Sequence, residues 1–349
     1  MDKPKVRIGV IGLGIWGQMH VTAYKQCNSA EIVAVCDLNE KLAEDTSVKY
    51  MIPGYYSDMN EMLEKENLDA VSIATPDNCH AEPVIKAAEK GLHVMVEKPL
   101  ATTVHECREM INAAKKNNVY LMIDWHNRWN PTFNYAWRAI RNNEIGDISY
   151  IYFRLSDTVY VPAKMLPWAG DSSVLHFLGS HSIDTICWLI KKKPKSIKCI
   201  KKEGILKRMG VDTPDLYLSI IDFEDGATAV VENSWALPQA YPSLIENKCE
   251  IIGSKGILML DPTGHRAVAK YTEETTKGFP ESSFPDLFVT PKVFDKQMGF
   301  AVESMYHFIE CIHDGKIPLT SGEDGLLNTI ILNAAEESAE AGKTVQIKL

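Results

Sequence analysis

The chain has 349 residues, 45% of them apolar, and a net charge of −9 at neutral pH. This length predicts about two domains, because single cores rarely grow beyond roughly 250–300 residues, and the apolar content argues against a disordered chain. The acidic balance argues against nucleic-acid binding, which needs a basic surface. No apolar run reaches the ~18 residues of a membrane span, so no membrane contact is expected.

The first third alternates short apolar runs with amphipathic stretches. The N-terminus begins with a strand pattern, whereas a signal peptide would have a longer apolar segment and a small-residue cleavage site. Thr103 and Glu106 form a capping box that predicts a helix to about residue 117, and Gly91 marks the end of the preceding helix. Buried strands between helices are typical of a parallel, doubly wound sheet. Strands are predicted over 6–12, 31–37, 69–76, 92–99 and 119–125.

The pattern changes after about residue 124, where strands follow one another without intervening helices. A β-rich run covers 148–157, and hairpins are predicted over 215–237, turning at Asp225-Gly226, and over 249–264. We therefore expect an α/β protein with a Rossmann domain over 1–124. A second α/β domain over 125–349 would contain an open, largely antiparallel mixed sheet.

Two further segments complete the chain. Residues 272–300 show little pattern and predict a long loop or arm, whereas a closing helix is predicted over about 323–342, with packing back on the first domain as one option. Eight cysteines include no C-x-x-C pair, so they are interpreted as reduced small hydrophobes in a cytoplasmic protein.

Gly12, Gly14 and Gly17 have the G-x-G-x-x-G spacing directly after the first predicted strand. Such a turn lets a pyrophosphate approach the backbone at a helix N-terminus, so Ile15 and Trp16 are also expected at the cofactor. The alternative is a glycine-rich turn without a ligand.

Asp37 ends the second strand, where a carboxylate accepts hydrogen bonds from ribose hydroxyls and repels a 2′-phosphate. No arginine follows Asp37, so NAD is favoured over NADP; FAD shares the fingerprint, but the motifs that follow argue for a nicotinamide.

Two further strands of the first domain end in polar motifs, at the sheet edge where ligands bind. Thr75, Pro76 and His80 belong to the first motif, and Glu97 and Lys98 to the second, E-K-P. A lysine buried beside a nicotinamide could relay a proton or donate a hydrogen bond to a reacting oxygen. A surface ion pair between Glu97 and Lys98 is the alternative.

Together these motifs and the later G-S-H-S-I-D resemble the Gfo/Idh/MocA family of sugar and inositol dehydrogenases, from about residue 5 to the C-terminus. The resemblance implies a Rossmann domain, a second α/β domain and NAD(P)-dependent oxidation of a secondary alcohol, or the reverse. It assigns Lys98 and His181 as catalytic residues and matches Asp184. The family's leading aspartate is replaced by Phe177, which leaves the usual dyad incomplete.

His176 and His181 lie five residues apart in an apolar segment. A base must remove the hydroxyl proton during hydride transfer, and imidazole suits this role, so His181 is the predicted base. His176 is a candidate to replace the polarity lost at Phe177. It precedes Phe177 by one residue, however, and in an α-helix neighbouring side chains point about 100° apart. Ordinary packing remains open for both histidines. A metal site is disfavoured, since helical ligand pairs prefer a spacing of about four and no third ligand motif is visible.

The segment 124–131, D-W-H-N-R-W-N-P, and the later Trp168 are predicted to line the substrate pocket, because aromatic faces pack against sugar rings. Within the segment 124–131, Arg128 matches a family position, and His126 is either a second acid/base group or a turn residue. The predicted substrate-binding set is Trp125, His126, Arg128, Trp129, Trp168, His176 and Asp184.

The leading hypothesis is NAD-dependent oxidation of a sugar, cyclitol or glycoside, with a glycoside 3-dehydrogenase among the options. One alternative is a redox-neutral glycosidase or lyase that retains NAD, and another is a non-catalytic NAD-responsive binding protein. The apolar outer face of an open sheet must be covered, so a homodimer or a dimer of dimers is also predicted.

Overall fold

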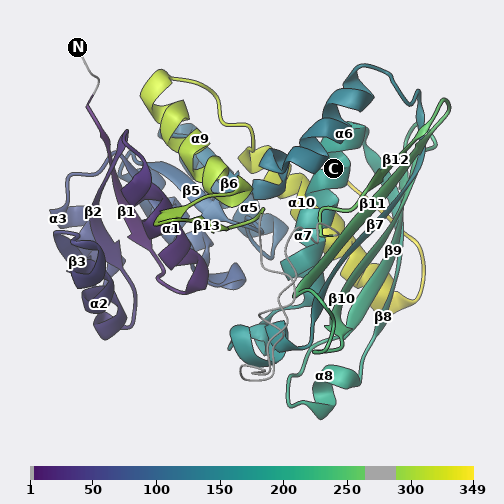
Figure 1. The fold of residues 1–349 in the computed structure, drawn as a ribbon, viewed down its shortest axis with the longest axis horizontal. Helices are drawn as coiled ribbons and strands as arrows, with labels where there is room; N and C mark the ends of the chain where they lie inside the picture. Colours follow the sequence, from purple (N-terminus) through teal and green to yellow (C-terminus); the bar gives the residue numbers. More distant parts are fainter. Residues whose placement is uncertain (1–3, 264–287) are drawn as a thin grey trace. The chain divides into compact units, whose positions relative to one another are not determined.

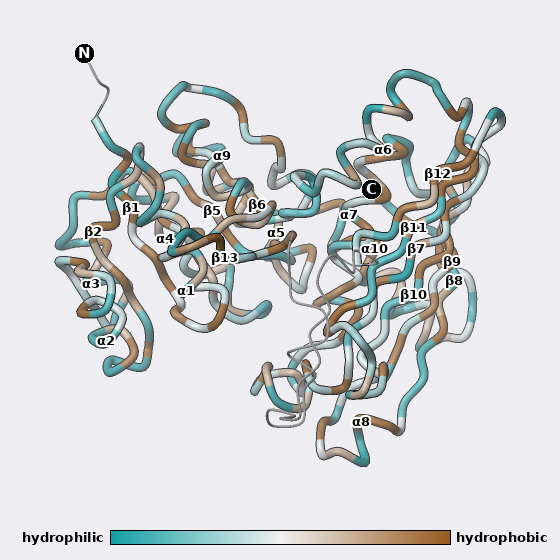
Figure 2. Tube along the Cα trace, viewed as in Figure 1, coloured by the Kyte–Doolittle hydropathy of each residue, from teal (hydrophilic) through white to brown (hydrophobic). Residues whose placement is uncertain are grey.

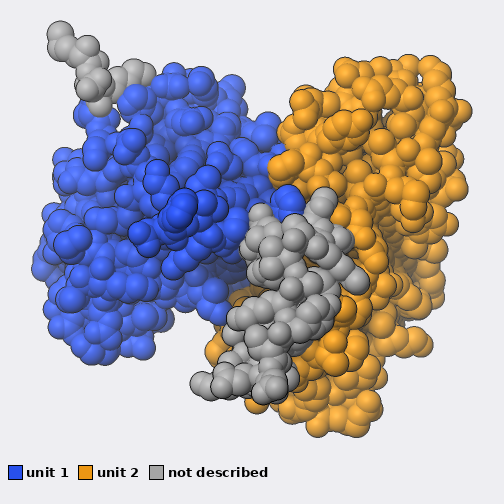
Figure 3. Space-filling view, in the orientation of Figure 1, with its two compact units in different colours: residues 1–129, 287–329 blue, residues 130–286, 330–349 orange. Residues whose placement is uncertain are grey.

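The computed structural model describes residues 4–263 and 288–349. The chain forms two compact units, one made of residues 1–129 and 287–329 and the other of residues 130–286 and 330–349 (Figure 3). The units therefore differ from the expected division at 124/125, because residues 287–329 belong to the first unit. The closing helix α10, Gly322–Ala341, begins in the first unit and ends in the second.

The first unit is built on a six-stranded sheet in the order β3-β2-β1-β4-β5-β6, with every neighbouring pair parallel (Figure 1). This is the doubly wound arrangement predicted for it, in which ligands bind at the carboxyl edge where the strand order reverses, between β1 and β4. The strands are β1 Val6–Ile11, β2 Ala30–Cys36, β3 Gly54–Tyr56, β4 Ala70–Ile73, β5 His93–Glu97 and β6 Leu121–Asp124.

Helices connect these strands, and several begin at a side-chain cap. Asn39, Asp58 and Thr103 accept a backbone N–H from the first turn of their helices, and Thr103 forms the predicted capping box with Glu106. The helices are α1 Ile15–Gln26, α2 Glu40–Tyr50, α3 Met59–Lys65, α4 Ala81–Glu89 and α5 Val104–Lys116, with short 3-10 turns at Asp77–Cys79 and His126–Trp129.

A helix that the sequence analysis did not identify completes the core of the first unit. Helix α9, Phe300–Asp314, buries Val302, Met305 and Phe308 in the same cluster as β1 and α1. A small hairpin of β13, Lys292–Val293, and β14, Lys296–Gln297, precedes it. The predicted arm over 272–300 is therefore partly ordered structure, and its remainder lies outside the described residues.

The second unit is built on a mixed sheet in the order β12-β11-β7-β10-β9-β8-β15, in which only β7 and β10 are parallel neighbours. Both predicted hairpins are confirmed, and Gly226 adopts a φ of +86° at the turn of the first. The strands are β7 Ile148–Thr158, β8 Pro194–Lys202, β9 Leu216–Phe223, β10 Thr228–Leu237, β11 Ile245–Gly253, β12 Ile257–Leu260 and β15 Val345–Gln346.

Burial alternates along β9, and hydrophilic and hydrophobic residues are interspersed along the strands of this sheet in Figure 2. One face of the sheet therefore packs on helices and the other faces outward. The helices of this unit are α6 Pro131–Arg141, α7 Ser180–Ile190 and the short α8 Ile205–Arg208, with π-helical turns over Val161–Met165 and Leu175–Gly179 and a 3-10 turn over Ala169–Asp171. Among the described residues, no helix combines the length and the apolar character that a membrane crossing needs.

Candidate active site

The turn after β1 has the geometry that its three glycines predict. A Cβ atom on Gly12, whose φ is +85°, would lie 2.6 Å from the Ala74 carbonyl oxygen, and one on Gly17 would lie 1.9 Å from the Gly12 carbonyl oxygen. At Gly14 the same atom would meet nothing within 4 Å. Gly12 and Gly17 therefore permit the turn and the helix contact, while Gly14 leaves room for a phosphate at the N-cap of α1.

Asp37 follows β2 beside this turn, and its carboxylate orders the backbone. One oxygen accepts the Leu13 N–H at 2.8 Å and the other accepts the Asn39 N–H at 2.9 Å. Each carboxylate oxygen has a further lone pair, so Asp37 can still accept hydrogen bonds from ribose hydroxyls, whereas a 2′-phosphate would meet its negative charge. The turn and this carboxylate together fit NAD.

His80 joins the loops that follow β4 and β5. Its Nε2 lies 3.0 Å from the Thr75 carbonyl oxygen and its Nδ1 lies 2.8 Å from the Pro99 carbonyl oxygen, and the side chain is buried. These contacts link the two loops, and the predicted contacts of His80, Thr75 and Pro76 with the cofactor stay predictions.

Glu97 and Lys98 end β5, and both are buried, so the alternative of a surface ion pair is wrong. Glu97 Oε1 lies 3.1 Å from His20 Nε2, and Glu97 Oε2 accepts the backbone N–H of Lys98. Burial raises the pKa of the Glu97 carboxyl, but the His20 hydrogen bond and the charges of His20 and Lys98 outweigh burial and hold it below its usual value. An anion is therefore fixed directly behind Lys98.

The segment after β6 serves mainly the interior of the first unit. Trp125 is completely buried in the core, and Arg128 donates to the Leu319 carbonyl oxygen at 2.8 Å. Trp129 packs against His307 with ring centroids 5.2 Å apart. These contacts favour a structural role for the three side chains, and their predicted role in substrate binding stays a prediction.

His126 is the exception in this segment. Its ring stacks on Trp16 with centroids 5.3 Å apart and also packs against Phe300, so it lies beside the start of α1. Burial, which outweighs the charge of Glu97, lowers the pKa of His126 to about 4, and the imidazole is neutral at pH 7. His126 stays a candidate acid/base group, and Trp16 stays a predicted cofactor contact.

In the second unit, His181 and Asp184 lie on α7, and both are buried. The preceding residues, Leu175–Gly179, form a π-helix, whose turn is wider than that of an α-helix. The rotation of about 100° per residue expected between His176 and Phe177 therefore does not apply to this segment.

His176 has a structural explanation in its partners. Its Nδ1 lies 3.2 Å from Ser173 Oγ and 3.4 Å from Glu336 Oε1. Glu336 is contributed by α10, and no local sequence signal indicated this pair. The contact favours packing as the role of His176, and its predicted contact with substrate stays a prediction.

Phe177 belongs to an aromatic cluster in the second unit. Its ring centroid lies 6.0 Å from that of Trp168 and 5.6 Å from that of Trp235. Trp235 comes from β10 and is completely buried, whereas Trp168 and Phe177 are half-buried. The sequence analysis identified Trp168 but not Trp235, whose inward position on an alternating strand was the available signal.

Comparisons with known proteins agree with this geometry. Residues 6–125 match a model described as an oxidoreductase family with an NAD-binding Rossmann fold, and residues 133–259 match the GFO/IDH/MocA C-terminal domain. Together these segments cover more than half of the chain. The chain belongs to the Gfo/Idh/MocA oxidoreductase family. The predicted fold class and the predicted NAD cofactor are thereby confirmed.

Full-length relatives of this family member are similar to it over nearly the whole chain. It is 26% identical to a myo-inositol 2-dehydrogenase of Thermotoga maritima over 98% of this chain and 99% of the relative. It is 28% identical to an NAD(+)-dependent scyllo-inositol 2-dehydrogenase of Bacillus subtilis over 98% and 96%, respectively. A solved scyllo-inositol dehydrogenase of Lactobacillus casei shares the fold with a TM-score of 0.81 at 20% identity, covering 98% of this chain and 99% of that one.

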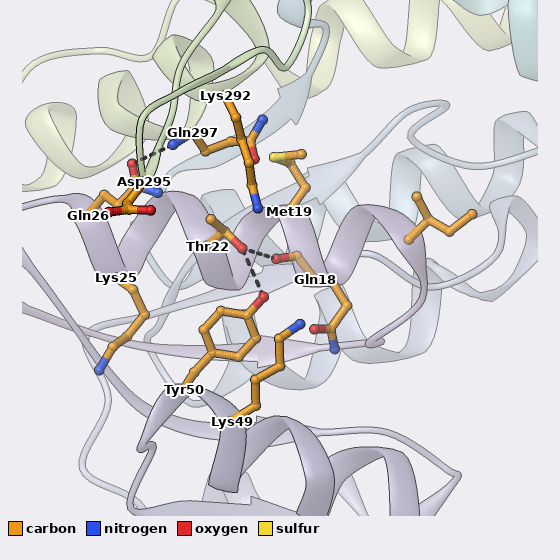
Figure 4. Close-up of a pocket in the computed structure, with 11 residues that line it drawn as sticks. Gln18, Met19, Thr22, Lys25, Gln26, Lys49, Tyr50, Lys292, Asp295 and Gln297 are labelled. Carbon is orange, nitrogen blue, oxygen red and sulfur yellow. Dashed lines mark hydrogen bonds between the residues drawn. The ribbon is translucent and has the colours of Figure 1, made fainter. Parts of the chain in front are cut away.

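One pocket of the first unit, of about 460 Å³, runs along α1 (Figure 4). Ile15, predicted at the cofactor and 60% exposed, is one of its lining residues. Farther along α1, Thr22 Oγ1 donates to the Gln18 carbonyl oxygen at 2.8 Å and lies 3.1 Å from the Tyr50 hydroxyl. Lys25, Lys49 and Lys292 also line this pocket.

Proposed function

We propose that this Gfo/Idh/MocA member uses NAD to oxidise a secondary hydroxyl of a sugar, cyclitol or glycoside to a ketone, or catalyses the reverse reduction. The observation that carries the proposal is the buried Glu97–Lys98 pair, at the carboxyl edge of the same sheet that bears the glycine turn. The names of the inositol dehydrogenase relatives support the substrate class.

The chemistry divides between the two units. NAD supplies the hydride acceptor when it is bound, held by Gly14 and Asp37. His181 accepts the hydroxyl proton as general base, and Lys98 donates a hydrogen bond to the same oxygen. The anionic Glu97 keeps a compensating charge behind Lys98 while the oxygen gains or loses its proton.

The aromatic cluster of Trp168, Phe177 and Trp235 supports a glycoside as the substrate. A carboxylate in place of Phe177 would bind hydroxyls, whereas the half-buried rings of Trp168 and Phe177 favour an apolar face such as the C–H face of a sugar ring or an aromatic aglycone. Glycoside 3-dehydrogenation is the finer form of the proposal.

A screen by NADH fluorescence tests both the dehydrogenase activity and the preference for a glycoside. Purified protein with NAD is offered cyclitols, free hexoses and aryl glycosides, and we expect NADH production, strongest with an aryl glycoside. Release of the aryl group without net NADH would instead identify the redox-neutral glycosidase. No turnover of any class, together with unchanged biological function in a Lys98→Ala/His181→Ala double variant, would identify a non-catalytic NAD-responsive protein.

We also propose that the outer face of the second sheet forms a homodimer interface, alone or within a dimer of dimers. Apolar side chains on this face are exposed on neighbouring strands, and such a patch is typical of an interface. They are Tyr150, Tyr152, Ile200, Leu218, Ile220, Ile257 and Met259.

Light scattering tests the interface. We expect the mass of at least a dimer for the natural chain and a lower mass for Ile220→Glu, while Ile205→Glu, a change of an exposed residue on α8, should leave the mass unchanged. A monomer mass that does not change with concentration would contradict the proposal.

A further inference from the structure

Behind Lys98, the first unit contains a chain of buried polar side chains that the sequence analysis did not single out. The Tyr24 hydroxyl lies 3.1 Å from Ser72 Oγ, and Ser72 Oγ lies 2.7 Å from His20 Nδ1. His20 Nε2 then lies 3.1 Å from Glu97 Oε1. Tyr24, His20 and Ser72 are completely buried or nearly so, and they come from α1 and β4.

The acceptor at the end of this chain fixes one hydrogen bond. Glu97 is an anion, because its pKa is held low, and an anionic carboxylate only accepts hydrogen bonds. His20 Nε2 therefore donates to Glu97 Oε1. Burial raises the pKa of Tyr24, so the phenol keeps its proton, which it donates to Met95 Sδ at 3.1 Å or to Ser72 Oγ.

A second carboxyl group, Asp124, lies beside the same end. Its Oδ1 accepts from Ser304 Oγ at 2.6 Å, whereas its buried Oδ2 accepts no hydrogen bond from the described residues and lies 3.7 Å from His20 Nε2. Burial, followed by the nearby charge of Glu97, raises the pKa of Asp124 to about 7. A proton on Asp124 removes the repulsion between its buried carboxylate and Glu97.

We propose that His20, whose ring is hydrogen-bonded to Ser72, fixes Glu97 as the anion behind Lys98, while Asp124 holds the proton that limits these two carboxyl groups to one negative charge. His20 and Asp124 are thus positioning residues for Lys98, a role that rests on the proposed dehydrogenase function. The titratable groups that face Asp124 are His20 of α1, Glu97 and Lys98 after β5, and Tyr24, with His126 nearby.

A bound metal is the rival interpretation, because one atom each of His20, Glu97 and Asp124 lie within 4.8 Å of one another. These side chains are completely buried or nearly so. The hydrogen bonds of His20 to Ser72 and to Glu97 account for the ring orientation without an ion.

Infrared spectroscopy of the apoprotein tests the proton without any substrate. We expect a protonated carboxylic acid whose C=O band titrates near pH 7 in the natural chain and in Lys98→Ala, and which is absent in Asp124→Asn. Persistence of the band in Asp124→Asn, or its absence from the natural chain at pH 5.5 (about 1.5 units below that midpoint), would overturn the proposal. If Asp124→Asn does not fold, the carboxyl ¹³C signal of aspartate-labelled natural chain gives the same titration.

Two further measurements separate this proposal from its rivals. Elemental analysis of the purified protein should find no stoichiometric divalent ion, and an ion that Asp124→Asn releases would overturn the proton interpretation. With a substrate from the screen, the natural chain should show a step in kcat near pH 7 that Asp124→Asn lacks. Ser304→Ala removes a hydrogen bond that lowers the pKa of Asp124, so it should move this step to higher pH. A titrating band without turnover of any substrate would instead contradict the dehydrogenase function alone.

Discussion

In the first unit the polar side chains near Lys98 are joined by hydrogen bonds into one network, whereas in the second unit the turn before His181 is lined by aromatic rings. Glu97 is surrounded by His20, the Lys98 backbone and Asp124. Phe177 instead lies between Trp168 and Trp235. Under the proposed function, the first arrangement would control charge at a reacting oxygen and the second would provide apolar surface for a ligand.

The largest effect should come from His181, the proposed general base of the second unit. His181→Ala should lower turnover by about 10²–10⁴, the usual loss for a general base, while NAD affinity changes little. Steady-state kinetics and NAD titration measure the two quantities, with His176→Ala as the matched control that should lose less. If His181→Ala kept more than about a tenth of turnover, His126 would replace it as the candidate base.

A smaller effect is expected at the cofactor end of the first unit. Asp37→Ser combined with Leu38→Arg should weaken NAD binding by about 10- to 100-fold, the value of a lost charged hydrogen bond, and improve NADP binding. Fluorescence titration with both cofactors measures the preference. Asp37→Asn is the control, because its amide oxygen can still accept one of the two backbone N–H groups. NADP binding more tightly than NAD to the natural chain would refute this role of Asp37.

Replacing an aromatic ring of the second unit by a carboxylate tests directly the contrast between the charged network and the aromatic cluster. Phe177→Asp should stabilise imidazolium at His181 and move the acidic limb of the pH–rate profile upward by about one unit, because an adjacent negative charge favours the protonated ring. Phe177→Asn, which is polar but uncharged, should leave that limb in place. Equal shifts in both variants would show that lost packing against Trp168 and Trp235, rather than charge, causes the change.

The smallest effect concerns stability. The pKa of Asp124 is about 7 in the folded state, against an ordinary value of 3.8. Between pH 3.8 and pH 7 the folded state therefore holds a proton on Asp124 that the unfolded chain has released. Its contribution to stability therefore falls as pH rises from about 4 to 7. The Tm of Asp124→Asn relative to the natural chain should rise across this range in thermal scans. A Tm difference that stays constant with pH would contradict the raised pKa.

The sequence predicted those features that depend on neighbours along the chain. The glycine turn, the capping box at Thr103 and the hairpin at Gly226 each rest on local backbone geometry, and all were found. The partners of His20 and His176 were not predictable, because Glu97 and Glu336 lie far away in sequence and are brought close only by sheet order and by α10. The burial of Trp125 and Arg128 could not be predicted either, since aromatic and basic residues suit a pocket as well as a core.

Helix α9 has a consequence for how the protein is made. The hydrophobic core on one face of the first sheet requires Val302, Met305 and Phe308, which follow β1 by nearly the whole length of the chain. During synthesis the N-terminal strands therefore leave the ribosome long before the helix that covers them, and their apolar face needs protection until then. A fragment ending near residue 129 should aggregate rather than fold, although it contains every strand of that sheet.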